Sequence, residues 1–209
     1  MRRHKEPEAR KSELIDAAQK LFVEKGYAKT TVTDILNVHG LSKGVFYYYF
    51  KSKEEVMDAI IQRMVDDMVD HAKRVVEDPG MTPPQKIFAI LMGKGQSEEM
   101  IKDKENMTRQ FHEVQNAEMH QKCLVLSIRR LAPVIAEVFK EDGQTVFSTE
   151  YLLESVTLFL TAGQMIFDEG LFQWGEEERA RYVAAFLEMM EKTLGVPAGY
   201  FDELKEKLA

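Results

Sequence analysis

Cysteine is nearly absent from this sequence of 209 residues, and long apolar runs are missing altogether. The single cysteine, Cys123, cannot form an internal disulfide, and its place in the apolar run CLVL favours a small buried side chain over a reactive thiol. No uninterrupted apolar stretch approaches the roughly 18 residues that a membrane-spanning helix needs. We therefore expect a cytoplasmic protein without a membrane partner.

Motifs typical of enzymes are missing as well. His112-Glu113 begins like a zinc-protease motif, but Asn116 stands where the second histidine is needed. No histidine has a glutamate three residues before it, so the Glu-x-x-His pairs of di-iron bundles are excluded. The sequence has neither a phosphate-binding glycine loop nor a nucleophile elbow. We expect no catalytic residue, no bound metal and no cofactor; a metal-dependent helical enzyme is the last of three functions left open.

Charge is present in quantity and is unevenly distributed. Apolar residues make up 44% and charged residues 30%, the balance of a globular chain with a buried core. Residues 1–53 carry 11 Lys or Arg against 6 Asp or Glu, whereas the rest of the chain carries 17 against 29. This asymmetry indicates that the N-terminal segment binds a polyanion.

Apolar residues recur every three to four positions along almost the whole chain, and no segment alternates with a period of two. This periodicity predicts an all-α fold. A short helix capped by Thr31 should end at His39, and a second should open at Ser42. The other predicted helices span residues 11–25, 52–77, 83–96, 98–115, 117–140, 149–172, 177–194 and 199–207.

The two short helices, joined by a turn at Gly40, predict a helix-turn-helix unit. Helical spacing divides the second helix into a packing face and an outer face. The packing face has Val45, Phe46, Tyr49 and Phe50 available, and the outer face holds Lys43, Gly44, Tyr47 and Tyr48. A glycine lets the backbone approach a duplex, a lysine reaches guanine edges or phosphates, and tyrosines offer hydroxyl donors and flat faces. We therefore predict double-stranded DNA as a partner.

The run YYYF alone could equally be an aromatic cluster packed in a helical core, but it belongs to a longer ordered pattern. The pattern consists of Gly26-Tyr27, Thr31-Val32-Thr33-Asp34-Ile35, Gly40-Leu41-Ser42-Lys43-Gly44 and Phe46-Tyr47-Tyr48-Tyr49-Phe50-Lys51-Ser52-Lys53. Over about residues 10–60 it closely resembles the DNA-binding domain of the TetR family of bacterial transcriptional regulators. Beyond residue 60 the likeness is limited to length and helical character.

The resemblance implies DNA-binding roles for particular residues. Thr31 and Thr33 look like the family's phosphate contacts, and the segment from Ser42 to Tyr48, including Val45, matches its recognition helix. Tyr47 and Lys53 match residues that clamp the DNA backbone. The sequence departs from the residues common in the family at Leu36, His39 and Tyr49. These departures affect the expected pitch of the recognition helix but not its existence.

The resemblance also implies two domains. Residues 1–53 would form the helix-turn-helix domain, and residues 54–209 a helical effector-binding and dimerisation domain, with the helix over 52–77 linking them. The segments 149–172 and 177–194 are apolar on several faces, which favours an isologous four-helix contact in a homodimer.

One amide points to an effector site in the larger domain. Gln164 lies within the apolar segment FLTAGQMIF, where a buried amide needs a hydrogen-bond partner that a ligand could supply. We predict a mostly apolar or aromatic effector near Phe111, Phe159, Gln164 and Phe167. We interpret the chain as a homodimeric repressor that reads a palindromic operator and releases it when the effector binds. The alternative is a helix-turn-helix protein without a small-molecule effector.

Overall fold

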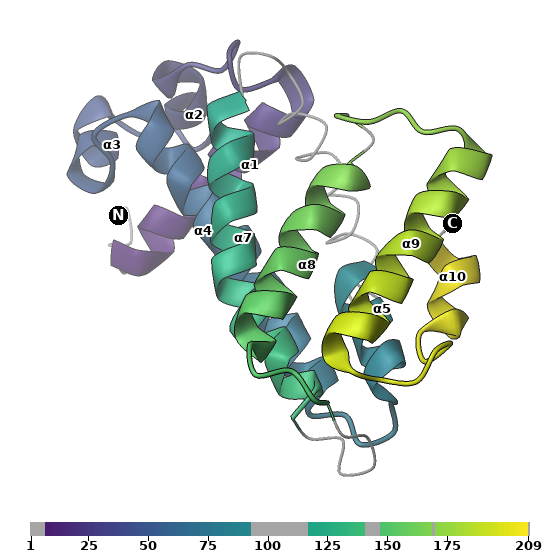
Figure 1. The fold of residues 1–209 in the computed structure, drawn as a ribbon. Helices are drawn as coiled ribbons and strands as arrows, with labels where there is room; N and C mark the ends of the chain where they lie inside the picture. The colour runs from purple at the N-terminus through teal and green to yellow at the C-terminus, as the bar shows by residue number, and fades with distance from the viewer. Residues whose placement is uncertain (1–6, 93–116, 141–146, 169, 209) are drawn as a thin grey trace. The chain divides into compact units, whose positions relative to one another are not determined.

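The computed structural model of the protein describes residues 7–92, 117–140, 147–168 and 170–208. Every helix or strand assigned in these ranges is an α-helix, which confirms the all-α prediction (Figure 1). The helices are α1 (Pro7–Lys25), α2 (Val32–Val38), α3 (Lys43–Tyr49), α4 (Lys53–Val76), α5 (Pro83–Met92), α7 (Ala117–Val138), α8 (Leu152–Ile166), α9 (Glu176–Leu194) and α10 (Asp202–Leu208). The helix predicted over 98–115 lies outside the described residues.

The chain forms two compact units, and α4 contributes to both. The described residues of the first unit are 7–66 and 117–123, and those of the second are 67–92, 124–140, 147–168 and 170–208. The change of unit within α4 falls between Asp66 and Asp67. The boundary predicted after residue 53 separates functional domains, and it stays a prediction.

In the first unit, α1, α2, α3 and the beginning of α4 pack around an aromatic and aliphatic core. Its fully buried side chains include Leu14, Phe22, Ile35, Phe46, Val56 and Ile60. The ring of Phe46 lies 5.9 Å from that of Phe50, which joins α3 to the segment before α4. The prediction that Phe46 and Phe50 pack inward is therefore confirmed.

Two glycines with left-handed backbones end the first two helices. Gly26 has φ 86° after α1, and Gly40 has φ 60° in the turn between α2 and α3. This conformation is open to glycine at little cost and is unfavourable for most other residues. The N–H of Leu41 donates to the carbonyl of Leu36 at 2.9 Å and closes the turn. The turn predicted at Gly40 is thus confirmed.

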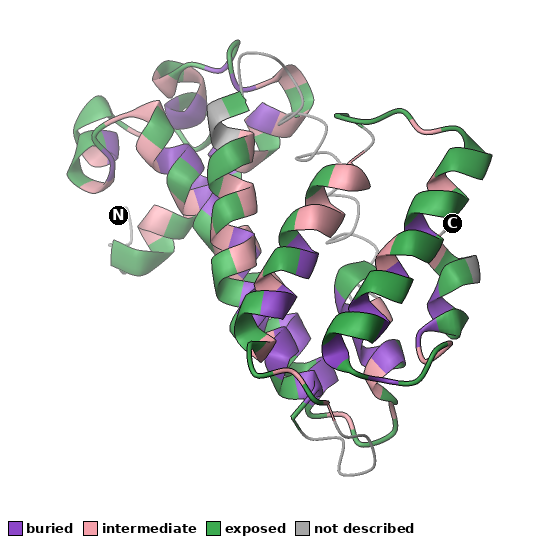
Figure 2. Cartoon of the chain, viewed as in Figure 1, coloured by how far each residue is buried: buried purple, intermediate pink, exposed green. Residues whose placement is uncertain are grey.

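In the second unit, α8 packs against α9, and α10 packs against both α9 and α5. Two buried charged groups satisfy backbone groups near helix ends. The Lys86 ammonium donates to the Val76 carbonyl at the end of α4, and the Glu191 carboxylate accepts the Phe201 N–H at 3.1 Å. Figure 2 shows buried and exposed bands alternating along α9, the pattern of a helix packed on one side.

Helix α8 is shorter than predicted. The sequence pattern predicts a helix over 149–172, but α8 ends at Ile166, so that prediction is wrong at its C-terminal end. The indole N–H of Trp174 donates to the Ile166 carbonyl at 2.8 Å and satisfies the last turn. The centres of the Phe172 and Trp174 rings lie 5.0 Å apart, and the rings are stacked. Phe172, which the sequence pattern places at the end of the helix, therefore packs in the loop after α8.

Candidate DNA-binding surface and effector cavity

The start of α2 is fixed by a reciprocal capping box, as predicted. The Asp34 N–H donates to the Thr31 hydroxyl oxygen at 3.1 Å, and the Asp34 carboxylate accepts from the Thr31 N–H at 2.8 Å. The Lys25 ammonium lies 2.8 Å from the same carboxylate. Hydrogen bonds from Lys25 and Thr31 hold the pKa of the Asp34 carboxyl well below its usual range. The cluster ties the end of α1 to the first turn of α2.

The capping box distinguishes the roles of Thr31 and Thr33, the two threonines that resemble the family's phosphate contacts. The Thr31 hydroxyl donates its one proton to the Asp34 carboxylate at 2.7 Å. The Thr33 side chain is exposed, and its hydroxyl has no hydrogen-bond partner among the residues that the structure describes. Thr33 is therefore better placed to donate to a phosphate, while Thr31 holds the helix start in position.

Lys53 makes internal contacts that the sequence did not reveal. Its ammonium donates to the carbonyls of Tyr27 at 2.8 Å and Thr30 at 3.0 Å, and it lies 4.0 Å from the centre of the Tyr27 ring. Burial lowers the pKa of this ammonium. An ammonium has three N–H donors, so a phosphate contact would use the third. Lys53 thus fastens the start of α4 to the turn between α1 and α2.

Helix α3 presents the outer face that the sequence predicts. Tyr47 is 58% and Tyr48 76% exposed, although large aromatic side chains are usually covered. Val45 is half-buried at the edge of this face, and its remaining exposed members are Ser42, Lys43 and Gly44. Ser42 is the N-cap of α3, as predicted, but its side chain makes no capping hydrogen bond. These side chains together form the candidate DNA-binding surface.

None of the residues that the structure describes requires a glycine at position 44. A Cβ atom built there would meet only the Ser42 hydroxyl oxygen, at 3.9 Å, an ordinary contact distance. The backbone at Gly44 is helical and has no positive φ. A glycine within a helix costs stability, so its use here is consistent with a close approach by an external molecule.

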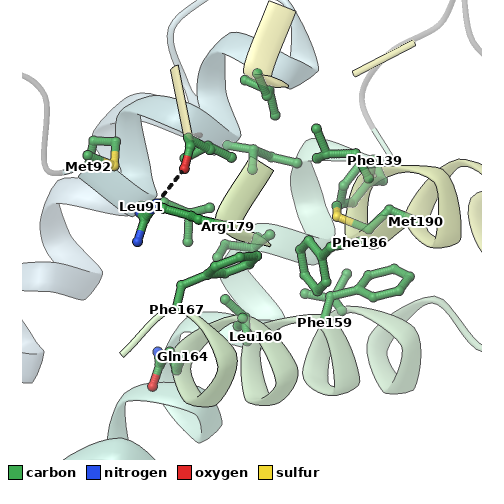
Figure 3. Close-up of a pocket in the computed structure, with 17 residues that line it drawn as sticks. Leu91, Met92, Phe139, Phe159, Leu160, Gln164, Phe167, Arg179, Phe186 and Met190 are labelled. Carbon is green, nitrogen blue, oxygen red and sulfur yellow. Dashed lines mark hydrogen bonds between the residues drawn. The ribbon is translucent and has the colours of Figure 1, made fainter. Parts of the chain in front are cut away.

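The second unit contains an apolar cavity of about 280 Å³ (Figure 3). Five helices line it, and most of the side chains are aliphatic or aromatic. The lining residues are Ile87, Leu91 and Met92 of α5, Ile135 of α7 and Phe139 just after it, Val156, Phe159, Leu160, Gly163, Gln164 and Phe167 at α8, Arg179, Phe186, Leu187 and Met190 of α9, and Leu204 and Leu208 of α10. Such a cavity is suited to a small apolar ligand.

Two polar side chains interrupt the apolar lining. The Oε1 atom of Gln164 is buried and has no hydrogen-bond partner within the described part of the chain. The Arg179 Nε donates to the Leu208 carbonyl at 3.2 Å, and the guanidinium carbon lies 5.8 Å from the centre of the Phe167 ring. The lining therefore contains an amide and a guanidinium among its apolar side chains.

The structure brings three of the four predicted effector residues together. Phe159, Gln164 and Phe167 line the same cavity, whereas Phe111 lies outside the described residues. Their role in ligand binding stays a prediction. The α9 contribution, which includes Arg179 and Phe186, was not predicted from the sequence. Arg179 and Phe186 are seven residues apart, so they lie on one face of a helix. The surrounding charged segment EEERAR makes this pattern hard to recognise in the sequence.

The described ranges contain neither a candidate metal site nor a candidate membrane-spanning helix. No three His, Cys, Asp or Glu side chains there are grouped so that they could hold a metal ion. No helix in the same ranges combines the length and apolar character that crossing a membrane requires.

Two models of one protein family match the chain. The model described as "Bacterial regulatory proteins, tetR family" matches residues 14–60, which include α2 and α3. The model described as "Tetracyclin repressor-like, C-terminal domain" matches residues 98–189, which include the whole of α8. The first match agrees closely with the segment whose motif pattern resembles this family.

Curated relatives are similar over part of the chain. The HTH-type transcriptional regulator TtgR of Pseudomonas putida is 26% identical over 122 residues, which is 58% of this chain and 54% of TtgR. The HTH-type transcriptional repressor KstR2 of Rhodococcus jostii is 39% identical over 67 residues, 32% of this chain and 33% of KstR2. The matches thus span at most 54% of these relatives' length.

Solved structures share the fold over most of the chain. Salmonella enterica GusR has a TM-score of 0.57 at 18% identity and covers 92% of this chain and 98% of its own. SmeT of Stenotrophomonas maltophilia, in a complex with triclosan, has a TM-score of 0.54 at 20% identity, covering 91% and 93%. At these identities the likeness establishes the fold alone. Together with the family models and the relatives, it shows that the chain belongs to the TetR family of bacterial transcriptional regulators.

Proposed function

We propose that the protein is a homodimeric transcriptional repressor that releases a palindromic operator when a small apolar or aromatic molecule enters the cavity. One observation carries the proposal: an exposed, tyrosine-rich α3 in one compact unit accompanies an apolar cavity of about 280 Å³ in the other. An apolar pocket of this size is suited to a small apolar molecule. The alternative, a helix-turn-helix protein without an effector, leaves this pocket unexplained.

In the proposed complex, α3 lies in the major groove of the operator. Lys43 and Tyr48 would contact base edges, while Thr33 and Tyr47 would donate to phosphates on either side. The excess of basic residues in 1–53, 11 against 6 acidic ones, supplies the electrostatic attraction to DNA. We propose that the protein binds its operator in the cytoplasm, where bacterial DNA is located.

Dimerisation is proposed through the sides of α8 and α9 that do not line the cavity. Leu158 and Met165 of α8 are 68% and 43% exposed, and Tyr182 and Met189 of α9 are 42% and 44% exposed. Each pair is spaced by seven residues and so lies on one face of its helix. Paired across a twofold axis, the two faces would bury these apolar side chains in a four-helix contact.

The dimer gives the cavity a means of controlling DNA binding. A dimer presents two α3 helices, which must be separated by about 34 Å to enter successive major grooves. An effector that binds better to a conformation with another separation shifts the population away from DNA. SmeT is described as a repressor of a multidrug efflux pump and was solved with triclosan, which supports an effector-controlled repressor here.

In the first step of the test, the purified protein selects the sequences that it binds from a pool of random duplex DNA. Fluorescence anisotropy then measures affinity for the strongest fragment, with and without compounds that raise the melting temperature in a thermal-shift screen. We expect at least one apolar compound both to stabilise the protein and to weaken operator binding. If every stabilising compound leaves operator affinity unchanged, the effector function is wrong and the DNA-binding protein without an effector remains.

A further inference from the structure

One side of α9 carries an exposed stripe with charges of both signs. The stripe consists of Glu177, Arg181, Ala185, Glu188 and Lys192, and all five residues are exposed. Successive members are three or four residues apart, so they follow one another along a single side of the helix. Lys192 pairs with Glu188 of its own helix, whereas Arg181 has no ion pair or hydrogen bond among the described residues. The stripe therefore has charge available for another molecule.

The same side of α9 is hollowed into a groove. The groove is lined by Glu178, Arg181, Tyr182, Ala184, Ala185 and Glu188. The two alanines are exposed and have the smallest side chains of this lining. The distance between two packed helices depends on the side chains at their contact, and small ones allow a close approach. The groove is therefore suited to a second helix.

The inner charges of the stripe are placed symmetrically about the two alanines. Arg181 lies three residues before Ala184. Glu188 lies three residues after Ala185. Two copies of α9 that cross antiparallel around a twofold axis between residues 184 and 185 would bring Arg181 opposite the partner's Glu188. An isologous contact is used twice, so this ion pair would form on both sides of the axis.

The outer charges of the stripe have the same centre. Glu177 lies seven residues before Ala184, and Lys192 lies seven residues after Ala185. The same axis would bring Glu177 opposite the partner's Lys192. Another register loses this match: an axis at residue 188 would place Glu188 against its own copy, and like charges in contact are unfavourable. The charge pattern is thus complementary to itself about one point of α9.

We propose that α9 packs antiparallel to α9 of a second copy of this chain, crossing between Ala184 and Ala185, with the charged stripe fixing this register. Tyr182 lines the same groove, so the apolar side that holds Tyr182 and Met189 adjoins the stripe and belongs to the same interface. The inference rests on the proposed homodimer and adds the register and the charged contacts between the protomers.

The first experiment mixes two charge-reversed variants of the full chain. Arg181→Glu places a carboxylate opposite the partner's Glu188, and Glu188→Arg places a guanidinium opposite the partner's Arg181. Each variant alone should therefore dimerise about tenfold more weakly than the wild type, or worse. A dimer with one protomer of each variant has opposite charges at both inner contacts. Native mass spectrometry should show such mixed dimers well above the roughly one half that random pairing gives.

The control mixture combines Arg181→Glu with Glu178→Arg. Glu178 lines the same groove and is exposed, but the proposed axis does not place it opposite Arg181. This mixture should show no excess of mixed dimers. The excess in the first mixture should shrink as salt is added, because exposed charges are screened.

Cysteine cross-linking locates the axis independently in a Cys123→Ser background. Ala185→Cys places a thiol beside the axis, so the two copies should form a disulfide between protomers under mild oxidation. Ala180→Cys is the control, because position 180 is exposed on the same helix. Its copy would lie nine residues, or roughly 13 Å, farther along the helix, beyond the reach of a disulfide.

The outcomes separate this register from the proposed function. A dimeric wild type whose charge-reversed variants pair at random, or which cross-links through Ala180→Cys and not through Ala185→Cys, would overturn the register and leave the homodimer standing. A wild type that is monomeric at micromolar concentration would remove the homodimer, and the register with it. Mixed dimers in excess together with the Ala185→Cys cross-link would establish both.

Discussion

At the scale of single residues, we expect stability and DNA binding to oppose each other at Gly44. Its backbone is helical and a Cβ atom would meet nothing closer than 3.9 Å, so Gly44→Ala should raise the free energy of unfolding by about 0.5–1 kcal/mol. The added methyl group should at the same time weaken operator binding, because α3 could not approach the duplex as closely. Urea denaturation and anisotropy measure the two effects.

Gly163→Ala in α8 is the matched control for this prediction. A Cβ atom there would lie 3.5 Å from the Phe186 ring, again an ordinary contact, and the residue lines the cavity in the second unit. It should stabilise its helix without changing the affinity of the free protein for DNA. A Gly44→Ala variant that binds the operator as tightly as the wild type would show that α3 does not depend on close backbone approach.

Lys43 and Tyr47 should differ in the kind of DNA contact they make. Phosphates carry no base identity, so Tyr47→Phe should weaken binding to all sequences alike, whereas Lys43→Ala should reduce discrimination between operator and mutated operator. A lost specific base contact costs about 1–3 kcal/mol at that base pair. Titrations against a set of single-base operator variants make the comparison. An unchanged pattern of base preference in Lys43→Ala would assign that lysine to the backbone.

At the scale of elements, the capping box of α2 predicts a pH dependence. The pKa of Asp34 is depressed in the folded state, so its ionised form stabilises the fold above the unfolded pKa of about 3.9, and this contribution is lost as pH falls toward the folded value. Asp34→Asn should therefore be less stable than the wild type at pH 7, and the difference should shrink below about pH 4.

Thermal denaturation between pH 3 and pH 7 measures this difference. The control is Glu24→Gln, which removes an exposed ion pair with Lys20 at 3.9 Å and should have little effect, since exposed pairs contribute little. A stability difference for Asp34→Asn that is constant across the range would show that the charge of Asp34 is not what stabilises α2.

Lys53 has two candidate roles: it holds the start of α4 in place, and it could contact a DNA phosphate. Its ammonium holds α4 to the Tyr27 and Thr30 carbonyls, so removing it would disturb the position of α3 as well as any phosphate contact. Reduced DNA affinity in a Lys53 variant would therefore have two possible sources. The salt dependence separates them, because losing one phosphate contact lowers the slope of log affinity against log salt by about one.

At the scale of the whole molecule, the outer sides of α8 and α9 predict the oligomeric state. Leu158→Glu would place one unpaired charge from each protomer in an apolar twofold contact, at a cost of several kcal/mol. We expect light scattering to show a dimer for the wild type and a lower mass for this variant. A monomeric wild type at micromolar concentration would contradict the dimer outright.

Val125→Glu is the control for dimerisation, since Val125 is an exposed apolar residue of α7, 48% exposed. It should leave the mass unchanged. Phe186 and Leu187 also lie in the segment 177–194 that the sequence predicts for the dimer contact. Phe186→Glu and Leu187→Glu are nevertheless unsuitable, because both residues line the cavity. They would disturb the effector site and the fold instead of testing the contact between protomers.

The coupling between effector and operator must be reciprocal if the molecule is a switch. A ligand at one hundred times its dissociation constant should stabilise the folded protein by about 2.7 kcal/mol. Operator DNA should then weaken ligand binding by the same factor by which the ligand weakens operator binding. Paired calorimetric and anisotropy titrations measure both factors. Unequal factors at equilibrium would mean that the two ligands do not act on one conformational equilibrium.

The sequence by itself determined the helical fold and the helix-turn-helix unit. These features depend on residues close together in the chain: Thr31 and Asp34 cap within one turn, and α3 divides its faces by helical spacing. The positions of Phe159 and Gln164 on one helix, with Phe167 directly after its last residue, followed in the same way. Local chemistry is readable without knowledge of distant contacts.

Only the tertiary structure decided what these local features face. Arg179 reaches the cavity because Leu208, 29 residues later, returns to accept its hydrogen bond. Lys53 is anchored by carbonyls 26 and 23 residues before it, and α8 stops where the Trp174 indole satisfies its last turn. In each case, residues separated in sequence meet only after helices pack. Periodicity identifies a helix's apolar side, but packing selects which neighbours cover it.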